Sequence, residues 1–157
     1  MARWHPQVAN EARLLVVAGL VWLSGGRLLV HRRAAHARFG AGMLELPGGK
    51  IEPGEAPEHA LARELVEEWG PEAVQLRIGS IAHVLHHVYP PPGPEVVLLV
   101  YHVDARGWGS AWRERVHAEG GEELAAFTTD ALPLPEFLPA DRPFLAAVAR
   151  GEHHPPW

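Results

Sequence analysis

The stretch GKIEPGEAPEHALARELVEEWGP, residues 49–71, decides the fold. Its second half predicts a helix over residues 57–69, because proline suits the first turn of a helix and the Gly-Pro pair at its end is a stop signal. Apolar side chains recur within it at steps of four, at Leu61, Leu65 and Trp69. This spacing gives the helix one apolar stripe with which to pack on a core.

Three glutamates of the same helix share a neighbouring face. Glu64, Glu67 and Glu68 are spaced i, i+3 and i+4, and like charges at this spacing repel by roughly a few tenths of a kcal/mol per pair. A structural helix gains nothing from this repulsion, although a solvated surface tolerates it. Mg²⁺ or Mn²⁺ prefers oxygen ligands and would offset it. Arg63 is placed to pair with Glu67 at i+4 and hold part of the cluster.

The joint spacing of these residues resembles the Nudix box, G-x5-E-x7-R-E-U-x-E-E-x-G-U, in which U is apolar. The matching positions are Gly49, Glu55, Arg63, Glu64, Leu65, Glu67, Glu68 and Gly70. One position departs, because Pro71 stands where the box has its last apolar residue. Since Pro71 follows the predicted end of the helix, we expect an altered exit from the helix and an intact ligand set.

The resemblance extends beyond the box to the MutT-like nucleoside triphosphate pyrophosphohydrolase subgroup of the Nudix hydrolase family. The segments RRAA (32–35), LELPGGKIE (44–52) and LPADRP (138–143) are each similar to segments of that subgroup. Together they extend the similarity over residues 14–150. The resemblance implies the Nudix fold, an α+β architecture (an α/β/α sandwich) with a mixed β-sheet between helices.

The rest of the chain predicts strands and one further helix. Apolar runs predict strands over residues 14–23, 27–33, 44–47, 74–89, 95–103 and 123–128, and a closing helix over 142–150. The turn Ser24-Gly25-Gly26 joins the first two strands into a hairpin. From the length of 157 residues we expect a single Nudix hydrolase domain over 1–157, with its core at about 13–150.

The resemblance also implies a metal site. Mg²⁺ or Mn²⁺ would be held by the Gly49 carbonyl and by the carboxylates of Glu64, Glu67, Glu68 and Glu119. The ions would neutralise a polyphosphate and lower the pKa of a bound water that attacks phosphorus. The implied catalytic residues are Arg63, Glu64 and Glu67. The general base stays open between Glu64 and an acid of the loop at 119–123.

Three further residues are implied as substrate contacts: Arg33, Lys50 and Asp141. Arg33 offers a planar fork to phosphate oxygens and Lys50 a mobile point charge, while the alternative for both is an ordinary surface cation. Asp141 would contact the edge of a nucleobase, as a hydrogen-bond acceptor or, when protonated, as a donor. It also suits an N-cap of the closing helix, and the two roles are compatible.

Composition bounds the other classes of function. The chain has no cysteine, which excludes disulfides, thiolate metal sites and thiol nucleophiles. Its net charge of −5 argues against a protein that coats nucleic acid non-specifically. Its eleven histidines include His86-His87 on opposite sides of a strand but no H-E-x-x-H pattern, so zinc is not expected. Residues 1–12 lack the positive-then-apolar order of a signal peptide, and no apolar run is long enough to span a bilayer. We therefore expect a cytoplasmic protein without a membrane partner.

We therefore predict metal-dependent hydrolysis of a nucleoside or deoxynucleoside triphosphate to the monophosphate and pyrophosphate. An oxidised substrate such as 8-oxo-dGTP would give the enzyme a role in nucleotide pool sanitation. The alternative substrates are a dinucleoside polyphosphate, a nucleotide sugar or an RNA 5′ end, and a further alternative is a non-catalytic nucleotide-binding module. The expected partner is a small nucleotide rather than a nucleic-acid polymer, and the expected assembly is a monomer or a homodimer.

Overall fold

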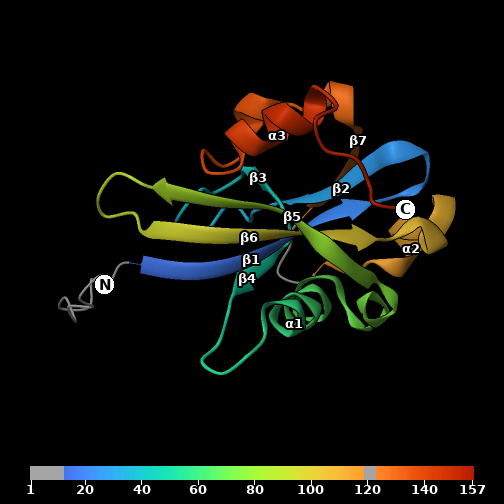
Figure 1. Cartoon of the computed structure of the whole chain (residues 1–157), viewed down its shortest axis with the longest axis horizontal. Helices are drawn as coiled ribbons and strands as arrows, with labels where there is room; N and C mark the ends of the chain where they lie inside the picture. The colour runs from blue at the N-terminus through green and yellow to red at the C-terminus, as the bar shows by residue number, and fades with distance from the viewer. Residues whose placement is uncertain (1–12, 119–122) are drawn as a thin grey trace, which may run out of the picture.

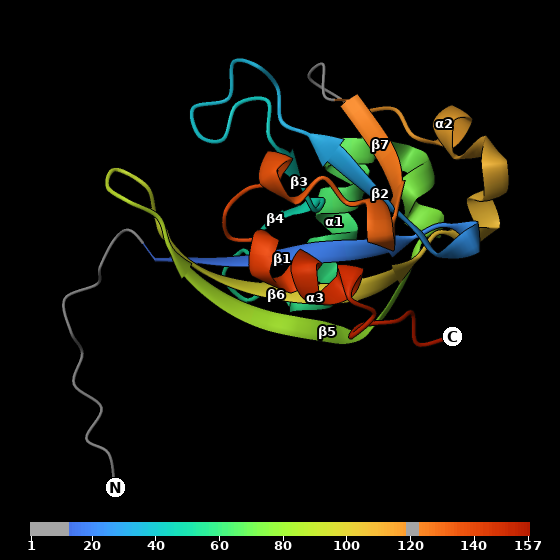
Figure 2. The same cartoon turned by 90° about the horizontal axis from the view of Figure 1, so that it is seen from above.

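The computed structural model describes residues 13–118 and 123–157, which form a seven-stranded mixed sheet between helices (Figure 1; Figure 2). The strands are β1 Arg13–Trp22, β2 Arg27–Arg32, β3 Leu44–Glu45, β4 Gly48–Lys50, β5 Arg77–Val88, β6 Glu95–Asp104 and β7 Glu123–Thr128. The helices are α1 Pro57–Trp69, α2 Trp112–Arg115 and α3 Arg142–Ala149. The strand order is β3-β2-β1-β6-β5, with β4 paired to β1 and β7 paired to β2.

β1 is the central strand, and its second edge is divided between two partners. It runs parallel to β6 in one uninterrupted register over Arg13–Trp22. On its other edge, β2 pairs antiparallel with residues 21–22 and β4 pairs antiparallel with residues 16–18. The sheet therefore splits along this edge, and the box loop is brought onto the middle of β1.

Gly48 is the point where the box loop meets β1. A Cβ at Gly48 would overlap the Val17 carbonyl oxygen and lie 2.7 Å from the Cα of Ala18. The residue also has a φ of 156°. Only a glycine allows this close approach of two backbones, so Gly48, the residue just before the box, has a structural reason to be glycine.

The apolar stripe predicted for α1 is buried against one face of the sheet. Leu61, Leu65 and Trp69 are at most 1% exposed and pack in one cluster with Val17 and Val21 of β1. Burial of each leucine stabilises the fold by about 1.5–3 kcal/mol. This packing fixes the rotation of α1, and its glutamate-bearing side consequently faces the box loop.

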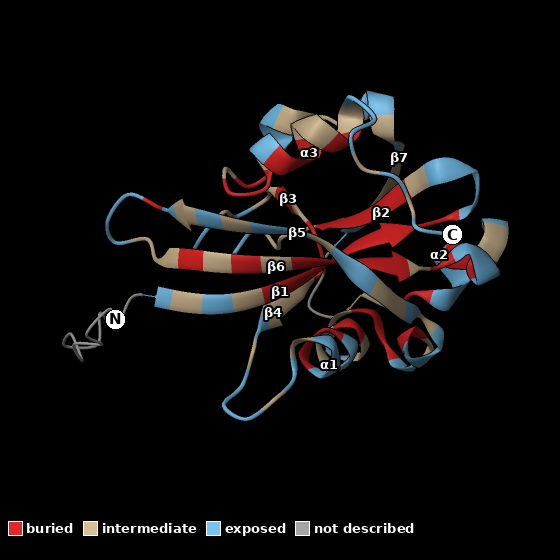
Figure 3. Cartoon of the chain, viewed as in Figure 1, coloured by how far each residue is buried: buried red, intermediate tan, exposed pale blue. Residues whose placement is uncertain are grey.

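α3 covers the opposite face of the sheet (Figure 1). Its buried residues Phe144, Leu145 and Val148 pack with Leu28 and Val30 of β2 in a second cluster. Figure 3 shows the buried residues concentrated in the central strands, with exposed residues on the outer sides of both helices. The expected mixed sheet between helices is confirmed.

The predicted elements are present, with differences at their ends. The strand expected over 74–89 begins at Arg77, because Pro71–Gln75 forms a 3₁₀ turn that leaves Val74 exposed. The strand expected over 44–47 is only Leu44–Glu45, and β4 and α2 were not predicted. The last two are three or four residues long, which is too short for a periodic pattern. In the described ranges, every helix is too short or too polar to cross a membrane.

Candidate active site

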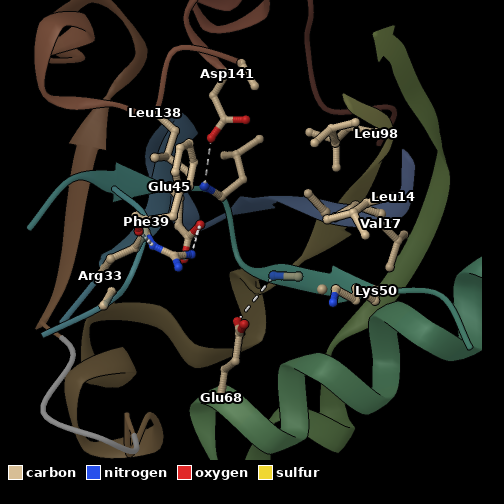
Figure 4. A pocket seen from close by; sticks show the side chains of 18 of the residues that line it. Leu14, Val17, Arg33, Phe39, Glu45, Lys50, Glu68, Leu98, Leu138 and Asp141 are labelled. Atoms are coloured by element: carbon tan, nitrogen blue, oxygen red, sulfur yellow. Dashed lines mark hydrogen bonds and ion pairs between the residues drawn. The ribbon is translucent and has the colours of Figure 1, made fainter. Parts of the chain in front are cut away.

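A cavity of about 640 Å³ opens beside the divided edge of β1 (Figure 4). At one end, here called the box end, it is lined by Gly48, Gly49, Lys50 and Glu68. At the other, the Asp141 end, it is lined by Arg33, Phe39, Glu45, Tyr89 and Asp141. Apolar side chains of β1 and β6, among them Leu14, Val17 and Leu98, line the wall (Figure 4). The cavity thus has two polar ends and an apolar side.

At the box end, Arg63 of α1 holds three carboxylates. Its guanidinium lies 2.8 Å from Glu55, 2.9 Å from Glu64 and 3.3 Å from Glu67, and it also donates to the carbonyl of Lys50 at 3.1 Å. The hydrogen bond from Arg63 is the main reason that the pKa of Glu55 falls to about 2. The predicted pairing of Arg63 with Glu67 is present, and Arg63 also ties α1 to the loop before it.

Glu64 lies directly against the glycine loop. A Cβ at Gly49 would overlap the Glu64 carboxylate, so this glycine leaves the space that the carboxylate occupies. Partial burial raises the pKa of Glu64, while the hydrogen bond and charge of Arg63 oppose the rise. Glu67 is more open, with 57% of its side chain exposed.

Glu68 is the box glutamate that lines the cavity. Its carboxylate accepts a hydrogen bond from the Gly48 N–H at 3.2 Å (Figure 4). The same oxygen, Oε2, lies 3.7 Å from Nδ1 of the buried His31 imidazole. Glu68 therefore joins α1 to the loop at the point where the loop crosses β1.

The residues at the box end suit a hard divalent cation in donor type and charge. Carboxylate oxygens are the ligands that Mg²⁺ and Mn²⁺ take, and Glu64 sits against the Gly49 backbone in a space without a Cβ. Within residues 13–118 and 123–157, no three acidic or histidine side chains converge as a ready ligand shell. Glu64 and Glu67 are instead drawn to Arg63, and Glu68 to Gly48. The predicted ligand Glu119 lies outside the described residues.

At the other end, Arg33 is held by protein groups on two sides. Its Nη1 donates to both oxygens of Glu45, at 3.1 and 3.0 Å, and its Nε donates to the carbonyl of Phe39 at 2.8 Å (Figure 4). Arg33 is therefore more than a surface cation, although it still lines the cavity. Lys50 differs, because its side chain is exposed and forms no ion pair with any described residue.

Asp141 is almost completely buried, with 4% of its surface exposed. Burial, and then the nearby charge of Glu45, raises the pKa of Asp141 to about 7. Its Oδ2 lies 3.5 Å from the Leu46 N–H, at the outer limit of a hydrogen bond (Figure 4). Beside it, the Tyr89 hydroxyl accepts a hydrogen bond from the Ala140 N–H at 3.2 Å.

The alternative of a side-chain N-cap is wrong for Asp141. The residue precedes α3, but its side chain makes no capping hydrogen bond. Its backbone is helical (φ −82°, ψ −23°), whereas a capping residue takes an extended conformation that points its side chain at the helix N–H groups. The carboxyl group turns into the cavity instead.

The sequence reasoning missed several residues of the site: His31, Phe39, Glu45, Tyr89 and the polar role of Trp69. Of these, His31 carried a usable signal. It is the single polar residue within the otherwise apolar core of the run RLLVHRR, which predicts a buried polar group in need of partners. The loop and strand-end residues carry no comparable local signal, because the fold alone brings them to the cavity.

A mixed sheet between helices, with the glycine loop and the glutamate-bearing helix α1 at one end of a cavity, is the arrangement of the Nudix class of hydrolases. The family model of the NUDIX domain matches residues 12–148. The chain therefore belongs to the Nudix family. The 8-oxo-dGTP diphosphatase of Escherichia coli (strain K12) is 31% identical over 138 residues, which cover 88% of this chain and 98% of that protein. The CTP pyrophosphohydrolase of the same organism is 35% identical over 133 residues, with 84% and 88% covered.

Solved structures show the same fold. The MutT NUDIX hydrolase of Burkholderia pseudomallei superposes with a TM-score of 0.66 at 27% identity, over 85% of this chain and 96% of that one. The E. coli ORF135 protein superposes with a TM-score of 0.67 at 24% identity, over 93% and 95%. With these relatives, the chain is a Nudix pyrophosphohydrolase of the MutT-like type.

Proposed function

We propose that this enzyme hydrolyses a nucleoside or deoxynucleoside triphosphate to the monophosphate and pyrophosphate with the help of a divalent metal ion. The observation that carries the proposal is the continuity of the cavity. A single space of about 640 Å³ joins the glycine loop and Glu68 to the buried carboxyl group of Asp141. A nucleotide carries a polyphosphate at one end and a base at the other. It therefore needs a site for phosphate and metal and a site for the base within one cavity.

At the box end, the residues that would hold Mg²⁺ or Mn²⁺ are the Gly49 carbonyl and the carboxylates of Glu64, Glu67 and Glu68. The ion would neutralise phosphate oxygens and lower the pKa of a bound water. Lys50, exposed and without an ion pair among the described residues, is available to a phosphate oxygen. Glu119 remains a predicted ligand.

Glu64 is the proposed proton acceptor within the described chain. Its carboxylate is partly buried, lies against the Gly49 backbone, and is fixed by Arg63 at 2.9 Å. A base held in position beside the reacting groups accepts a proton more efficiently than a freely moving carboxylate. Arg63 is then a positioning residue, because it orders Glu55, Glu64 and Glu67 together.

At the Asp141 end, we propose recognition of a nucleobase edge. A carboxyl group with a pKa of about 7 is available in both forms near neutral pH, as a hydrogen-bond donor or as an acceptor. Phe39 and Tyr89, whose rings meet edge to face with centroids 4.5 Å apart, offer aromatic surface for the base. The 8-oxo-dGTP diphosphatase and CTP pyrophosphohydrolase relatives make an oxidised guanine and a cytosine the first bases to compare.

A nucleotide panel with Mg²⁺ in ¹⁸O-labelled water tests the proposal. The panel contains dGTP, 8-oxo-dGTP, CTP, a dinucleoside polyphosphate, a nucleotide sugar and an RNA with a 5′-triphosphate. We expect monophosphate and pyrophosphate from at least one free triphosphate, and the label identifies the phosphorus that water attacks. Absence of pyrophosphate from every triphosphate would defeat the proposal, and two nucleotide products from the dinucleotide would favour that alternative substrate.

A further inference from the structure

A fully buried histidine, His31 of β2, touches acidic residues from both ends of the cavity. Its Nε2 lies 2.8 Å from Oε1 of Glu45 at the Asp141 end. Its Nδ1 lies 3.7 Å from Oε2 of Glu68 at the box end and 3.2 Å from the indole Nε1 of Trp69. Burial of a polar imidazole costs free energy unless its nitrogen atoms are hydrogen-bonded, so the partners of His31 indicate its role.

These partners assign the tautomer of His31. An indole N–H is a donor only, so Nδ1 of His31 accepts the hydrogen bond from Trp69. Nε2 then carries a proton, and it donates a hydrogen bond to Glu45 at 2.8 Å. The 3.7 Å separation from Glu68 is too long for a hydrogen bond. Trp69, a residue of the α1 core stripe, thus fixes the direction in which His31 donates.

Glu45 passes this constraint on to Arg33. Its Oε1 receives both the His31 N–H and Arg33 Nη1, and its Oε2 receives Arg33 Nη1 at 3.0 Å. The Glu45 carboxylate is thus held by His31 and by Arg33 together. Without the His31 donor, Glu45 loses one of these two partners, and the bifurcated contact of Arg33 Nη1 with its oxygens is less firmly placed.

We propose that His31 is a positioning residue for substrate binding, which acts through Glu45 on Arg33 and is itself locked by Trp69. The substrate that Arg33 meets rests on the proposed function; the chain of contacts does not. The consequence is a link between the helix that carries the box and the Asp141 end. The packing of α1 then sets the position of Arg33, the arginine that contacts the nucleotide.

The chain offers a matched control. His102 is also a buried histidine whose Nδ1 accepts a hydrogen bond from a tryptophan, Trp22, at 3.0 Å. It does not line the cavity. A substitution at His102 therefore disturbs the same kind of core contact without reaching Arg33.

The test compares His31→Gln with His31→Asn. The amide N–H of glutamine mimics Nε2–H and keeps a donor toward Glu45, whereas the amide oxygen of asparagine mimics Nδ1 and keeps only the acceptor toward Trp69. With the best triphosphate of the panel, we expect His31→Asn to raise KM about tenfold with little change in kcat. His31→Gln should stay within about threefold of the wild-type KM. His102→Asn should lower Tm and leave KM unchanged.

A double-mutant cycle locates the effect. In an Arg33→Ala background, His31→Asn should change KM by less than about twofold, because the residue on which it acts is gone. Equal KM values for His31→Asn and His31→Gln, or a full tenfold rise in the Arg33→Ala background, would overturn the proposal. If kcat, KM and Tm move together in all His31 variants, the role is structural only.

A readout without substrate separates this proposal from the proposed function. ¹⁵N NMR of the His31 imidazole should show a proton on Nε2, and His31→Asn should alter the signals of the Arg33 guanidinium. A ring without a proton on Nε2 would overturn the positioning role even in an active enzyme. A correct tautomer in a protein that hydrolyses no triphosphate would overturn the proposed substrate, and KM would then be measured with the nucleotide that the panel identifies.

Discussion

At the box end of the cavity the charged groups come from one short stretch of chain and stay partly in water, whereas at the Asp141 end the polar groups come from separate segments and include two that are buried. Glu55 and Glu67 meet Arg63, whose side chain is 31% exposed, while His31 is completely buried and Asp141 nearly so. Partly exposed ion pairs add little to stability, but buried polar groups strongly affect the pKa values and hydrogen bonds around them. The box end therefore suits the proposed divalent ion, and the Asp141 end suits a fixed set of hydrogen bonds.

The largest expected effect is at the box end. Glu67→Gln and Glu68→Gln should each lower kcat at least about hundredfold, because each removes a charged ligand from the proposed ion. The stability of Glu67→Gln should hardly change, since this side chain is 57% exposed and the helix loses a like-charge repulsion. Steady-state kinetics with a Mn²⁺ titration and thermal unfolding measure the two effects. Glu72→Gln, which alters an exposed glutamate paired with Arg115, is the control. A box variant with full activity would refute the metal assignment.

A smaller effect should follow from crowding the box loop. Gly49→Ala places a Cβ where the Glu64 carboxylate lies, so that carboxylate must move. We expect kcat to fall about tenfold, because a displacement of a catalytic group by an ångström costs one to two orders of magnitude. Gly107→Ala, whose added methyl meets no atom within 4 Å, should behave as wild type. If Gly49→Ala keeps its activity, the position of Glu64 is unimportant to the reaction.

The ionisation of Asp141 should make the stability of the protein depend on pH. The folded-state pKa of Asp141, about 7, lies above its ordinary value of 3.8. The folded protein therefore binds an extra proton between these values, and its stability is present at low pH and falls as pH rises through about 7. Asp141→Asn, which stays neutral, should have a higher Tm than wild type at pH 8, and this advantage should shrink at pH 5. Thermal unfolding at the two pH values measures it, and a pH-independent difference would contradict the shift.

The smallest expected effect has the opposite sign and belongs to Glu55. Its pKa of about 2 lies below the ordinary 4.5, so the stability it adds is present above about pH 4.5 and is lost as pH falls toward 2. Glu55→Gln should therefore lower Tm slightly at pH 7 and less at pH 3. High salt should weaken the effect, because the ion pair with Arg63 is exposed to solvent. A salt-independent difference would mean that Glu55 acts through packing.

The arrangement at the box end was largely predictable from local spacing, whereas the Asp141 end was predicted only in part, at Arg33 and Asp141. Helical spacing alone places Glu64, Glu67 and Glu68 on one face and pairs Arg63 with Glu67. It does not reveal that Arg63 also gathers Glu55 and Glu64, because the loop has to fold back on α1 for that contact. For Asp141, the local pattern favoured an N-cap and the resemblance favoured a nucleobase contact, and only the three-dimensional structure turned its carboxyl group into the cavity.

By itself, the sequence determined the elements whose signals are local: the amphipathic helix, the glycine loop before it, the apolar strands and the family to which they belong. Such signals depend on residues a few positions apart, which interact in any fold that contains the element. The tertiary structure decided the divided edge of β1, the cavity beside it, and the contacts of His31 with Glu45 and Trp69. These join residues far apart in the chain, and burial supplies their energetic importance, so they exist only after the sheet and its helices have packed.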